Sequence, residues 1–534
     1  MPNSIADNIA RLRAVKTAIG NAIVRRGGSI EETDGLEDFP QAIVDIPKTG
    51  YEHGGVNFFD VDGTILHSFT TEEFLALEEM PENPDRSWDW LTAQGWNWSL
   101  SDAKAYVRNY GALNIGQHYI TIDNKTAIHV VLKEGCLNPQ LGLYVKGTID
   151  VDWGDDSEHD TLTGSSTNTY VYATHTYDKP GRYYILLTVT SGSAIIKGAS
   201  SSNKLFCKGG IGSGTVGNES KKYTNCIQDI HIGANVDIGS YAFYRCYSMK
   251  HVSIPSTVRS ISNGTFCWNT ALQAVVVPEG VTSLGTSTFE GCYGLRFVST
   301  PKSLTSLGQK CFSQCYSVIA LTFSDSLTTI DQKCFPDTPS CDVLQVPGVT
   351  GALPLEFVAR NRTMGYFTIP EGVTEIGQDA FTYCYGLLQV TVPSTLKSTG
   401  QNAFSYCQTL TSIELPDTFT TMGISSFESC SALQEIKIPS SMTVIPQKAF
   451  KGCASLSHIE IPEGITEIGT EAFSTCSGLA TIKFEGSTPP TLSNSNTFAN
   501  LETDCKILVP AGSLADYTSA QYYPSSSTYT YEEY

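Results

Sequence analysis

The sequence predicts a multidomain, mainly β protein in which a solenoid with a 23-residue period follows an immunoglobulin-like β-sandwich and an N-terminal helical segment. Three observations support this prediction: prolines and phenylalanines recur at a fixed interval, short alternating apolar runs precede them, and the first residues have helical periodicity. The recurring residues are Pro255, Pro278, Pro301, Pro347, Pro370, Pro393, Pro416, Pro439 and Pro462, with Phe243, Phe266, Phe289, Phe312, Phe335, Phe381, Phe404, Phe427, Phe450 and Phe473. Such strict recurrence is typical of a solenoid, whose neighbouring repeats bury one another's apolar surface.

Length and charge narrow the classes of function. At 534 residues the chain is too long for one core and is expected to form several domains. Its formal net charge of −20 argues against nucleic-acid binding, which needs clustered Lys and Arg, so protein or carbohydrate partners are expected. No apolar run reaches the roughly 20 residues of a membrane-spanning helix, and the N-terminus lacks the pattern of a secretory signal. We therefore expect no membrane insertion and no signal-dependent export.

Residues 1–47 are predicted to form a helical attachment or oligomerisation segment. Apolar residues recur there at three- and four-residue steps, as on one helix face: Ile5, Ile9, Leu12, Val15 and Ile19. This face either joins subunits as a coiled-coil seam or folds back on a second short helix at 36–44, and the sequence does not decide between the two.

The same segment carries a resemblance. Ile5-Ala-Asp-Asn-Ile-Ala and Gly35-Leu-Glu-Asp-Phe-Pro resemble the N-terminal segments of phage and prophage tail proteins. The resemblance implies attachment to other tail or baseplate proteins and a homo-oligomer, with a trimer as the first expectation because tail fibres are commonly trimeric.

Residues 48–115 are predicted to form a small tryptophan-rich α+β domain. Val56-Asn-Phe-Phe-Asp-Val-Asp-Gly-Thr64 is similar to the nucleophile motif of haloacid-dehalogenase-type phosphatases. However, no succession of strands and crossover helices follows to build that family's sheet. A hairpin turn explains Asp62-Gly63 more simply, so we predict no catalytic residues.

The rest of this domain is aromatic. Four of the six tryptophans cluster at Trp88, Trp90, Trp96 and Trp98. A buried aromatic core is favoured over an exposed sugar or partner site. Ser99 or Ser101 is expected to cap a helix that Gly111 ends. The run from Asp60, with Gln94-Gly-Trp-Asn-Trp, also resembles a module of tail-associated proteins of phages of gut bacteria.

Residues 116–199 are predicted to form the β-sandwich, because several short strands lie between turn signals. Val151-Asp-Trp-Gly-Asp-Asp-Ser157 and Thr174-His-Thr-Tyr177 are similar to the hallmark of the PKD domain family. That resemblance implies a spacer or binding module with Trp153 and Tyr177 in its core. Clustered carboxylates could hold calcium, although acidic turn residues in water explain them more simply: Asp152, Asp155, Asp156 and Asp160. We predict no metal site, and a Gly/Ser-rich linker over 200–225.

Residues 226–490 are predicted to form the solenoid. Each repeat contains a strand of the form Leu-x-x-Ile-x-Ile-Pro, and its outward residues should line a continuous exposed face that includes Glu414, Lys437 and His458. Many cysteines share one phase: Cys246, Cys292, Cys315, Cys384, Cys407, Cys430, Cys453 and Cys476. We interpret them as a buried column of thiols rather than disulfides or a zinc site, since no Cys-x-x-Cys pair occurs.

The repeated pattern Ile-Gly-x-x-Ala-Phe-x-x-Cys-x-x-Leu-x-x-Ile-x-Ile-Pro resembles the BspA-type leucine-rich repeat family. The resemblance implies a leucine-rich-repeat solenoid that recognises proteins or host surfaces, with no catalytic residues and no cofactor in the motif. A C-terminal cap and tail are expected over 491–534, because solenoids need atypical ends. Residues 525–534 are expected to be a pliant tail.

Two features depart from a plain repeat. Between Leu353 and Glu375, Val358 takes the Phe position and Asn361 the Cys position, which predicts a kink or a functional patch around 354–362. The second feature is an aromatic stripe beside the Cys column, which suits glycan stacking or a protein hot spot, with surface packing between repeats as the plainer alternative. The candidate ligand-binding residues are Tyr247, Trp268, Tyr293, Tyr316, Tyr385, Tyr406, Glu414, Lys437 and His458.

Together the resemblances predict a phage virion protein, a tail fibre or receptor-binding protein. It would assemble in the host cytoplasm and contact a host surface protein or glycan through its repeats. The alternative is a bacterial cell-surface adhesin of the BspA type, which would require an export signal or wall anchor. Neither hypothesis involves enzymatic activity.

Overall fold

A computed structural model describes residues 55–83, 91–121, 123–198, 205–208, 221–501, 504–525 and 529–534. The predicted helix face Ile5, Ile9, Leu12, Val15 and Ile19 lies outside these residues, as do Trp88 and Trp90. The chain divides into two compact units. Among the described residues, 55–58, 65–81 and 99–113 belong to the first, and the others to the second. No helix in the described ranges is long and apolar enough to cross a bilayer.

The first unit combines strands and helices. They are β1 (Gly55–Phe59), β2 (Ile65–Thr70), α3 (Thr71–Ala76) and α4 (Leu100–Tyr110). Ser99 caps α4 by accepting a hydrogen bond from the Asp102 amide, and Gly111 ends the helix at φ 85°, as predicted.

The aromatic core of this unit is built from phenylalanines. The Phe58 ring centroid lies 5.8 Å from that of Phe69 and 6.0 Å from that of Phe74. Of the tryptophan cluster, Trp98 is buried, as predicted, and Trp96 is half-buried, and both belong to the second unit.

The turn at residues 60–64 opens the second unit along the chain. The Asp60 amide donates to the Thr64 carbonyl at 2.9 Å, the Gly63 amide donates to the Asp60 carbonyl at 2.9 Å, and Gly63 has φ 78°. The Asp60 carboxylate accepts a hydrogen bond from the Tyr119 hydroxyl at 2.8 Å. The Asp62 carboxylate accepts one from the Thr64 amide at 2.9 Å. The predicted hairpin turn is confirmed, and both carboxylates serve the turn and its packing.

Long antiparallel strands follow. They are β5 (Thr126–Leu132), β6 (Pro139–Asp152), β7 (Asp160–Thr174), β8 (Gly181–Ile196) and β9 (Phe206–Lys208). Strand β6 pairs with β7, β8 and β9, and β8 also pairs with β5. Trp153 and Tyr177 are buried as expected, and the Tyr177 hydroxyl donates to the Trp153 carbonyl at 2.9 Å. The predicted β-rich region before the repeats is confirmed.

Two carboxylates of this region's acidic cluster bind neighbouring side chains. The Asp160 carboxylate accepts from Trp153 Nε1 at 2.8 Å, and Asp155 lies 2.8 Å from His175 Nε2. Burial raises the pKa of Asp155, but hydrogen bonds from Ser157 and His175 outweigh this and hold the pKa below its ordinary value. These contacts agree with the interpretation of the carboxylates as turn residues.

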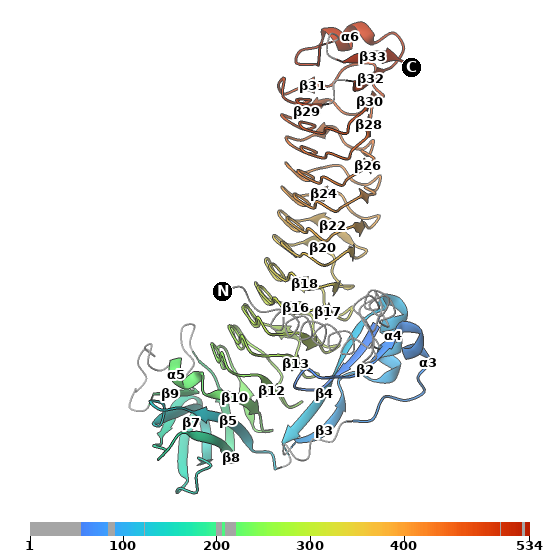
Figure 1. Ribbon diagram of the computed structural model, residues 1–534. Helices are drawn as coiled ribbons and strands as arrows, with labels where there is room; N and C mark the ends of the chain where they lie inside the picture. The colour runs from blue at the N-terminus through green and yellow to red at the C-terminus, as the bar shows by residue number, and fades with distance from the viewer. Residues whose placement is uncertain are drawn as a thin grey trace, which may run out of the picture. The chain divides into compact units, whose positions relative to one another are not determined.

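One sheet joins these strands to the repeats. Strand β10 (Ile227–His231) pairs antiparallel with β5 and parallel with β12 (His251–Ser253), so β5, β10 and β12 lie side by side (Figure 1). Asp229 in β10 lies 2.8 Å from His129 Nδ1 and 2.7 Å from His251 Nδ1. Strand β9 and helix α5 (Lys221–Thr224) occur within the segment predicted as a linker. The hydrophobic core runs from Ile128 into the repeats without interruption.

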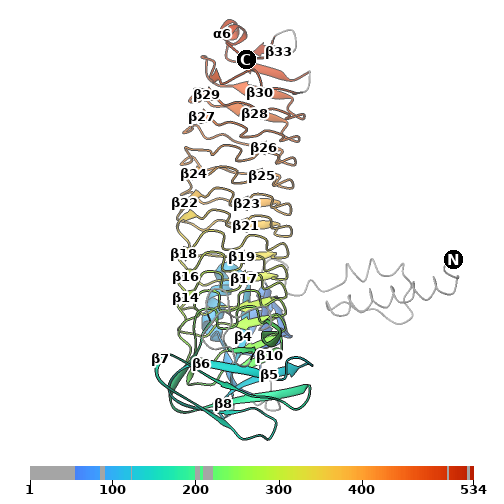
Figure 2. The ribbon, with the colours of Figure 1, turned by 90° about the vertical axis from the view of Figure 1, so that its left-hand side faces the viewer.

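Most repeats contribute two short parallel strands, and Figure 2 shows the two resulting columns. The first column, which was predicted, contains β13 (Ala274–Val276), β15 (Phe297–Ser299), β17 (Ala320–Thr322), β19 (Val343–Gln345), β21 (Tyr366–Thr368), β23 (Gln389–Thr391), β25 (Ser412–Ile413), β26 (Glu435–Ile436), β28 (His458–Ile461) and β30 (Thr481–Phe484). The second column, which was not predicted, contains β14 (Ser283–Leu284), β16 (Ser306–Leu307), β18 (Thr329–Ile330), β20 (Gly351–Leu353), β22 (Val373–Ile376), β24 (Ser398–Thr399), β27 (Val444–Ile445), β29 (Glu467–Ile468) and β31 (Thr491–Leu492). Strand β11 (Val236–Ile238) precedes both columns and pairs with β8.

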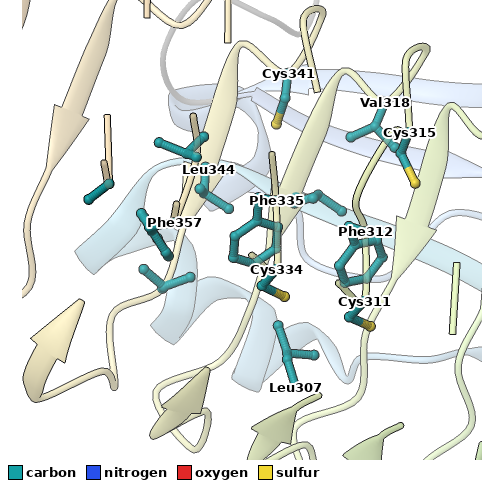
Figure 3. Close-up of a cluster of buried hydrophobic side chains, with 14 of the residues drawn as sticks. Leu307, Cys311, Phe312, Cys315, Val318, Cys334, Phe335, Cys341, Leu344 and Phe357 are labelled. Atoms are coloured by element: carbon teal, nitrogen blue, oxygen red, sulfur yellow. The ribbon is translucent and has the colours of Figure 1, made fainter. Parts of the chain in front are cut away.

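Phenylalanine and cysteine columns fill the space between the strands (Figure 3). Neighbouring phenylalanine rings stack with nearly parallel planes, for example Phe404 on Phe427 at 5.4 Å and 5°. The cysteine thiols donate to the carbonyl of the Phe position one repeat earlier, for example Cys430 Sγ to Phe404 at 3.1 Å. All fifteen cysteines for which side chains are described are free and buried, which confirms the prediction of a thiol column.

The strand face of the first repeats is covered. Strands β3 (Leu91–Trp96) and β4 (Leu113–Thr121) pair antiparallel, and residues of β4 contact this face. Ser299 Oγ donates to the Asn114 carbonyl at 2.9 Å, and the Gly116 amide donates to Ser299 Oγ at 3.2 Å. The Trp98 indole donates to the Thr300 carbonyl at 3.2 Å. Every residue of β13, β15 and β17 is therefore buried.

The predicted continuous exposed face is consequently wrong for the first repeats and correct further along. In β21 and β23 the outward residues are exposed and the inward ones buried. Glu414, Lys437 and His458 are exposed as predicted. A close approach of β4 makes the difference, because a Cβ atom on Gly116 would lie 2.4 Å from Val276 Cγ2.

The C-terminus closes the array. Strand β32 (Lys506–Val509) pairs with β30, as expected for a closing strand, and helix α6 (Leu514–Ser519) follows. Strand β33 (Thr530–Glu533) pairs parallel with β32. The Glu533 carboxylate accepts a hydrogen bond from the Gly512 amide at 3.0 Å. Residues 530–533 are thus part of the cap, and the expectation of a pliant tail is wrong there.

Candidate binding site on the turn ridge

Two positions of each repeat form a ridge on the turns beside the Phe column, and we call it the turn ridge. The first position, two residues after the Phe position, adopts left-handed backbone angles throughout: Arg245, Trp268, Gly291, Gln314, Asp337, Arg360, Tyr383, Tyr406, Ser429, Gly452 and Thr475. The second position, four residues after the Phe position, carries Tyr247, Tyr293, Tyr316, Pro339, Arg362 and Tyr385.

The left-handed backbone is held by the stack itself. This conformation costs a non-glycine residue on the order of 1–2 kcal/mol, so it needs compensating contacts. The Arg360 amide donates to the Thr382 carbonyl of the next repeat at 2.8 Å, and the Tyr383 amide donates to the Ser405 carbonyl at 2.9 Å. Side chains at this position are therefore presented at a fixed spacing.

Aromatic side chains of the ridge form two groups. In the first, Trp268 contacts Tyr293 edge to face at 5.7 Å, and Tyr293 stacks on Tyr316 at 4.8 Å. In the second, Tyr383 stacks on Tyr406 at 4.7 Å and lies 6.0 Å from Tyr385. Both groups pack between repeats, as the plainer hypothesis expects, yet Tyr316, Tyr383 and Tyr385 remain 42%, 37% and 37% exposed.

A pocket lies between the two aromatic groups. Its volume is about 530 Å³, and we call it the tyrosine–arginine pocket. Its lining residues are Tyr316, Asp337, Pro339, Arg360, Arg362, Tyr383 and Tyr385. Exposed aromatic faces that surround a few charged groups are the usual composition of a recognition site.

The two arginines of this pocket have different electrostatic surroundings. Arg360 Nε donates to Asp337 Oδ1 at 2.7 Å, and its Nη2 lies 3.4 Å from Glu356 Oε2. Burial lowers the pKa of Arg360, but the hydrogen bond and charge of Asp337 outweigh this and raise it. Within the described part of the chain, no carboxylate lies within ion-pair distance of Arg362, whose side chain is exposed.

Buried Asn361 positions both arginines, since it lies between them in sequence. Its Nδ2 donates to the carbonyls of Thr338 at 2.7 Å and Cys341 at 2.9 Å. Its Oδ1 accepts from the amides of Thr363 at 3.0 Å and Met364 at 2.8 Å. The amide side chain thus fixes the turn that a cysteine holds in other repeats.

The same repeat interrupts the phenylalanine stack. Val358 occupies the Phe position, and the neighbouring Phe357 is buried in its place. The Phe357 ring lies beside Phe335 (Figure 3), at 5.4 Å and with an interplanar angle of 88°. It also meets Phe381 at 6.0 Å with an angle of 69°. The predicted patch around 354–362 therefore coincides with an edge-on ring inside and the two arginines outside.

A second, smaller pocket adjoins the first, because Arg360 and Tyr383 line both. Its volume is about 260 Å³, and it also contains Thr382, Asn402, Ser405 and Tyr406. Three carboxylates line it as well, those of Glu356, Asp379 and Glu428, and we call it the acidic pocket.

The structure separates the predicted ligand-binding residues into two sets. Tyr316 and Tyr385 line the tyrosine–arginine pocket, Tyr406 lines the acidic pocket, and Trp268 and Tyr293 extend the ridge. Tyr247 belongs to the ridge at its first repeats. Glu414, Lys437 and His458 belong to the strand column and line neither pocket.

Sequence analysis missed the charged half of the site. Asp337 and Arg360 share the ridge position of Trp268 and Tyr383, and Arg362 shares that of Tyr316 and Tyr385. A column-by-column alignment of the repeats would have placed these side chains together. Only the departure from the pattern around 354–362 was noticed.

The comparisons with known proteins concern the repeats. The model of the BspA type leucine rich repeat region matches residues 218–350 and 357–505, more than half of the chain. The chain belongs to the BspA-type leucine-rich repeat family. The match is interrupted at 351–356, next to the repeat that carries Arg360 and Arg362. No curated protein matches the chain.

Several solved structures are similar to the chain. A leucine-rich repeat protein from Bacteroides ovatus is 21% identical, with 65% of this chain and 97% of that one covered and a TM-score of 0.42. A leucine rich cell surface protein from Faecalibacterium prausnitzii is 22% identical, with 63% and 93% covered and a TM-score of 0.32. The pneumococcal vaccine antigen PcpA is 18% identical, with 56% and 79% covered and a TM-score of 0.36. Most residues that line the two pockets lie within the ranges that the family model matches.

Proposed function

We propose that this BspA-type protein is a cell-surface adhesin that recognises a macromolecule on another cell through the turn ridge. The tyrosine–arginine pocket carries the proposal, because three exposed tyrosines and two arginines converge there on a cavity of about 530 Å³. Tyrosine and arginine are the side chains most enriched among residues that dominate binding energy. Membership of a leucine-rich repeat family supports a binding role, since solenoids offer extended binding surfaces.

The covered strand face adds a second argument for the ridge. Strand β4 and its neighbours occupy the outward side of β13, β15 and β17. A ligand of the first repeats therefore cannot reach this strand face, whereas Trp268 and Tyr293 on their turns are partly exposed. The ridge, by contrast, is continuous from Trp268 through Tyr316 to Tyr406.

A matched pair of variants tests the site. Tyr383→Ala removes an aromatic side chain that is 37% exposed from the pocket, whereas Tyr366→Ala removes a more exposed tyrosine, at 50%, from the strand column. We expect Tyr383→Ala to weaken binding of the purified chain to intact cells by about tenfold, as for a side chain that contributes more than about 1 kcal/mol. Tyr366→Ala should bind like the unaltered chain. Equal loss for the two variants would exclude the pocket as the principal site.

The second candidate function is a phage tail fibre or receptor-binding protein. It is supported by the resemblance of residues 5–10, 18–23 and 35–43 to tail-protein segments, which lie outside the described residues. Attachment to tail proteins, a trimer and location in the virion belong to this candidate. Its recognition step would use the same ridge.

Locating the protein in its source culture separates the two candidates. An adhesin should be labelled by antibody on intact producing cells and should sediment with them. A tail protein should instead copurify with phage particles after lysis. Antibody labelling confined to particles would overturn the adhesin proposal.

A further inference from the structure

The tyrosine–arginine pocket holds a positive charge that the described chain does not neutralise. Arg360 is paired with Asp337 and Glu356, whereas Arg362 has no carboxylate within ion-pair distance among the described residues. The turn that carries Arg362 is fixed by the four hydrogen bonds of buried Asn361. The guanidinium group is therefore attached to a rigid base and points from it into a pocket.

We infer that this pocket binds one carboxylated sugar residue of an otherwise uncharged glycan. The inference rests on the proposed recognition function and specifies its ligand. The planar guanidinium group of Arg362 matches a carboxylate with two parallel hydrogen bonds, the geometry that gives arginine its preference for planar anions. The carboxylate would supply the charge that the pocket lacks.

The tyrosines of the pocket can pack against the ring of the bound sugar. Tyr316 stands on one side of the arginines along the ridge, and Tyr383 and Tyr385 stand on the other. Their exposed ring faces can pack against the apolar C–H faces of a pyranose, while their hydroxyl groups remain available to its polar edge. A volume of about 530 Å³ accommodates more than one sugar ring.

The acidic pocket limits the ligand to one negative charge. Glu356, Asp379 and Glu428 line the neighbouring cavity, where carboxylates can accept hydrogen bonds from sugar hydroxyls but repel a second anion. The net charge of −20 acts in the same direction, because a polyanion approaching the chain is repelled as a whole. Polysulfated chains and nucleic acids are therefore disfavoured, and an isolated carboxylated sugar is not.

The backbone of the ridge argues against an acidic peptide as the occupant. A peptide bound in extended form gains much of its affinity from main-chain hydrogen bonds to an exposed strand edge. The amides of Arg360 and Tyr383 already donate to carbonyls of the next repeat. Side-chain contacts are what the pocket offers, and they suit a hydroxyl-rich ligand.

Binding of simple sugars to the full chain tests the inference. The probes are the methyl glycosides of glucuronate, galacturonate and N-acetylneuraminate, each beside an uncharged counterpart, with N-acetylglutamate amide as a peptide-like carboxylate. Titrations followed by saturation-transfer NMR give their dissociation constants. We expect at least one acidic sugar to bind about tenfold or more tightly than its counterpart, which corresponds to one charge-assisted contact of about 1.4 kcal/mol.

Two variants that remove the same charge provide the control. Arg362→Gln should abolish the preference for the acidic sugar, and Lys437→Gln, on the exposed strand column, should leave it unchanged. Both side chains are exposed, so both variants are expected to fold. The inference is overturned if no acidic sugar is preferred, if N-acetylglutamate amide binds as tightly as the sugars, or if Arg362→Gln keeps the preference.

Failure of this inference can be distinguished from failure of the proposed function. If sugars do not bind but Tyr383→Ala still weakens attachment to cells, the ridge recognises a protein and only the ligand class is wrong. If substitutions in the pocket change neither sugar binding nor attachment of the chain to cells, the proposed recognition site itself is wrong.

Discussion

Replacing Asn269 by cysteine should stabilise the repeat array, whereas the same replacement at Asn361 should destabilise it. Both asparagines occupy the cysteine position of their repeats and both are buried, at 0% and 1% exposure. Their hydrogen bonding differs completely. Nδ2 and Oδ1 of Asn269 have no hydrogen-bond partner, whereas the Asn361 amide makes four hydrogen bonds.

The magnitudes follow from these contacts. A buried polar group without a partner costs about 1–3 kcal/mol, so Asn269→Cys should recover that amount. The new thiol could also donate to the Phe243 carbonyl, as Cys292 Sγ does to Phe266 at 3.0 Å. At Asn361 four hydrogen bonds of about 0.5–1.5 kcal/mol each would be lost, a destabilisation of roughly 2–6 kcal/mol. The equivalent acceptor, the Phe335 carbonyl, already receives the Thr338 hydroxyl at 2.8 Å.

Urea unfolding followed by circular dichroism is the assay. Repeat arrays can unfold in sections, so transition midpoints are compared rather than one free energy. We expect a higher midpoint for Asn269→Cys and a lower one for Asn361→Cys, with faster hydrogen exchange at the amides of Thr363 and Met364 in the second variant. A shift of both midpoints in the same direction would refute the reasoning.

Three further predictions concern stability and reactivity. Burial lowers the pKa of His118 to about 4, below the value of about 6.5 in the unfolded chain, so the unfolded chain takes up the proton first as the pH falls. The free energy of unfolding should therefore fall by about 3 kcal/mol between about pH 6.5 and pH 4. Thermal melting measured over this pH range should show a smaller fall for His118→Gln. Gly116→Ala should cost about 1–3 kcal/mol by overpacking against Val276, and it should increase hydrogen exchange in β4; unchanged exchange would contradict the close contact. Burial raises the pKa of Cys430 to about 12, so iodoacetamide at neutral pH should leave this thiol unmodified until the chain unfolds, as peptide mass spectrometry can show.

The architecture of the repeats could be predicted because the same 23-residue period recurs many times in the sequence. Each copy places Phe, Cys and Leu in the same phase, and a solenoid is stable only when such positions stack. The second strand column was missed because its strands, such as Ser283–Leu284, lie outside the alternating Leu-x-x-Ile-x-Ile-Pro pattern that marks the first column.

The covered strand face could not be predicted from a single repeat. Outward positions such as Ala274 and Phe297 are apolar and buried beside Gly63 and Phe59, whereas Gln389 and Glu435 at equivalent positions are polar and exposed. This difference is visible in the sequence, but it does not reveal a covered strand face until the covering segment is known. Trp98 illustrates the same limit, because its partner Thr300 is 202 residues away.

The candidate site was predicted in part. The aromatic half was found because tyrosines stand out beside the cysteine column. The charged half was not found, because scattered charges are ordinary on a protein surface. It consists of Asp337, Arg360 and Arg362. Only the fixed spacing of the left-handed turns brings the two halves together.

Binding to intact cells tests the central claim, that the pocket around Arg362 is the recognition site, most directly. Purified full-length chain, Arg362→Gln and Lys437→Gln would be titrated onto the same cells. We expect about a tenfold weaker apparent affinity for Arg362→Gln alone, as for the loss of one charge-assisted contact. Unchanged binding of Arg362→Gln, or a loss found only for Lys437→Gln, would contradict it and move recognition to the strand face.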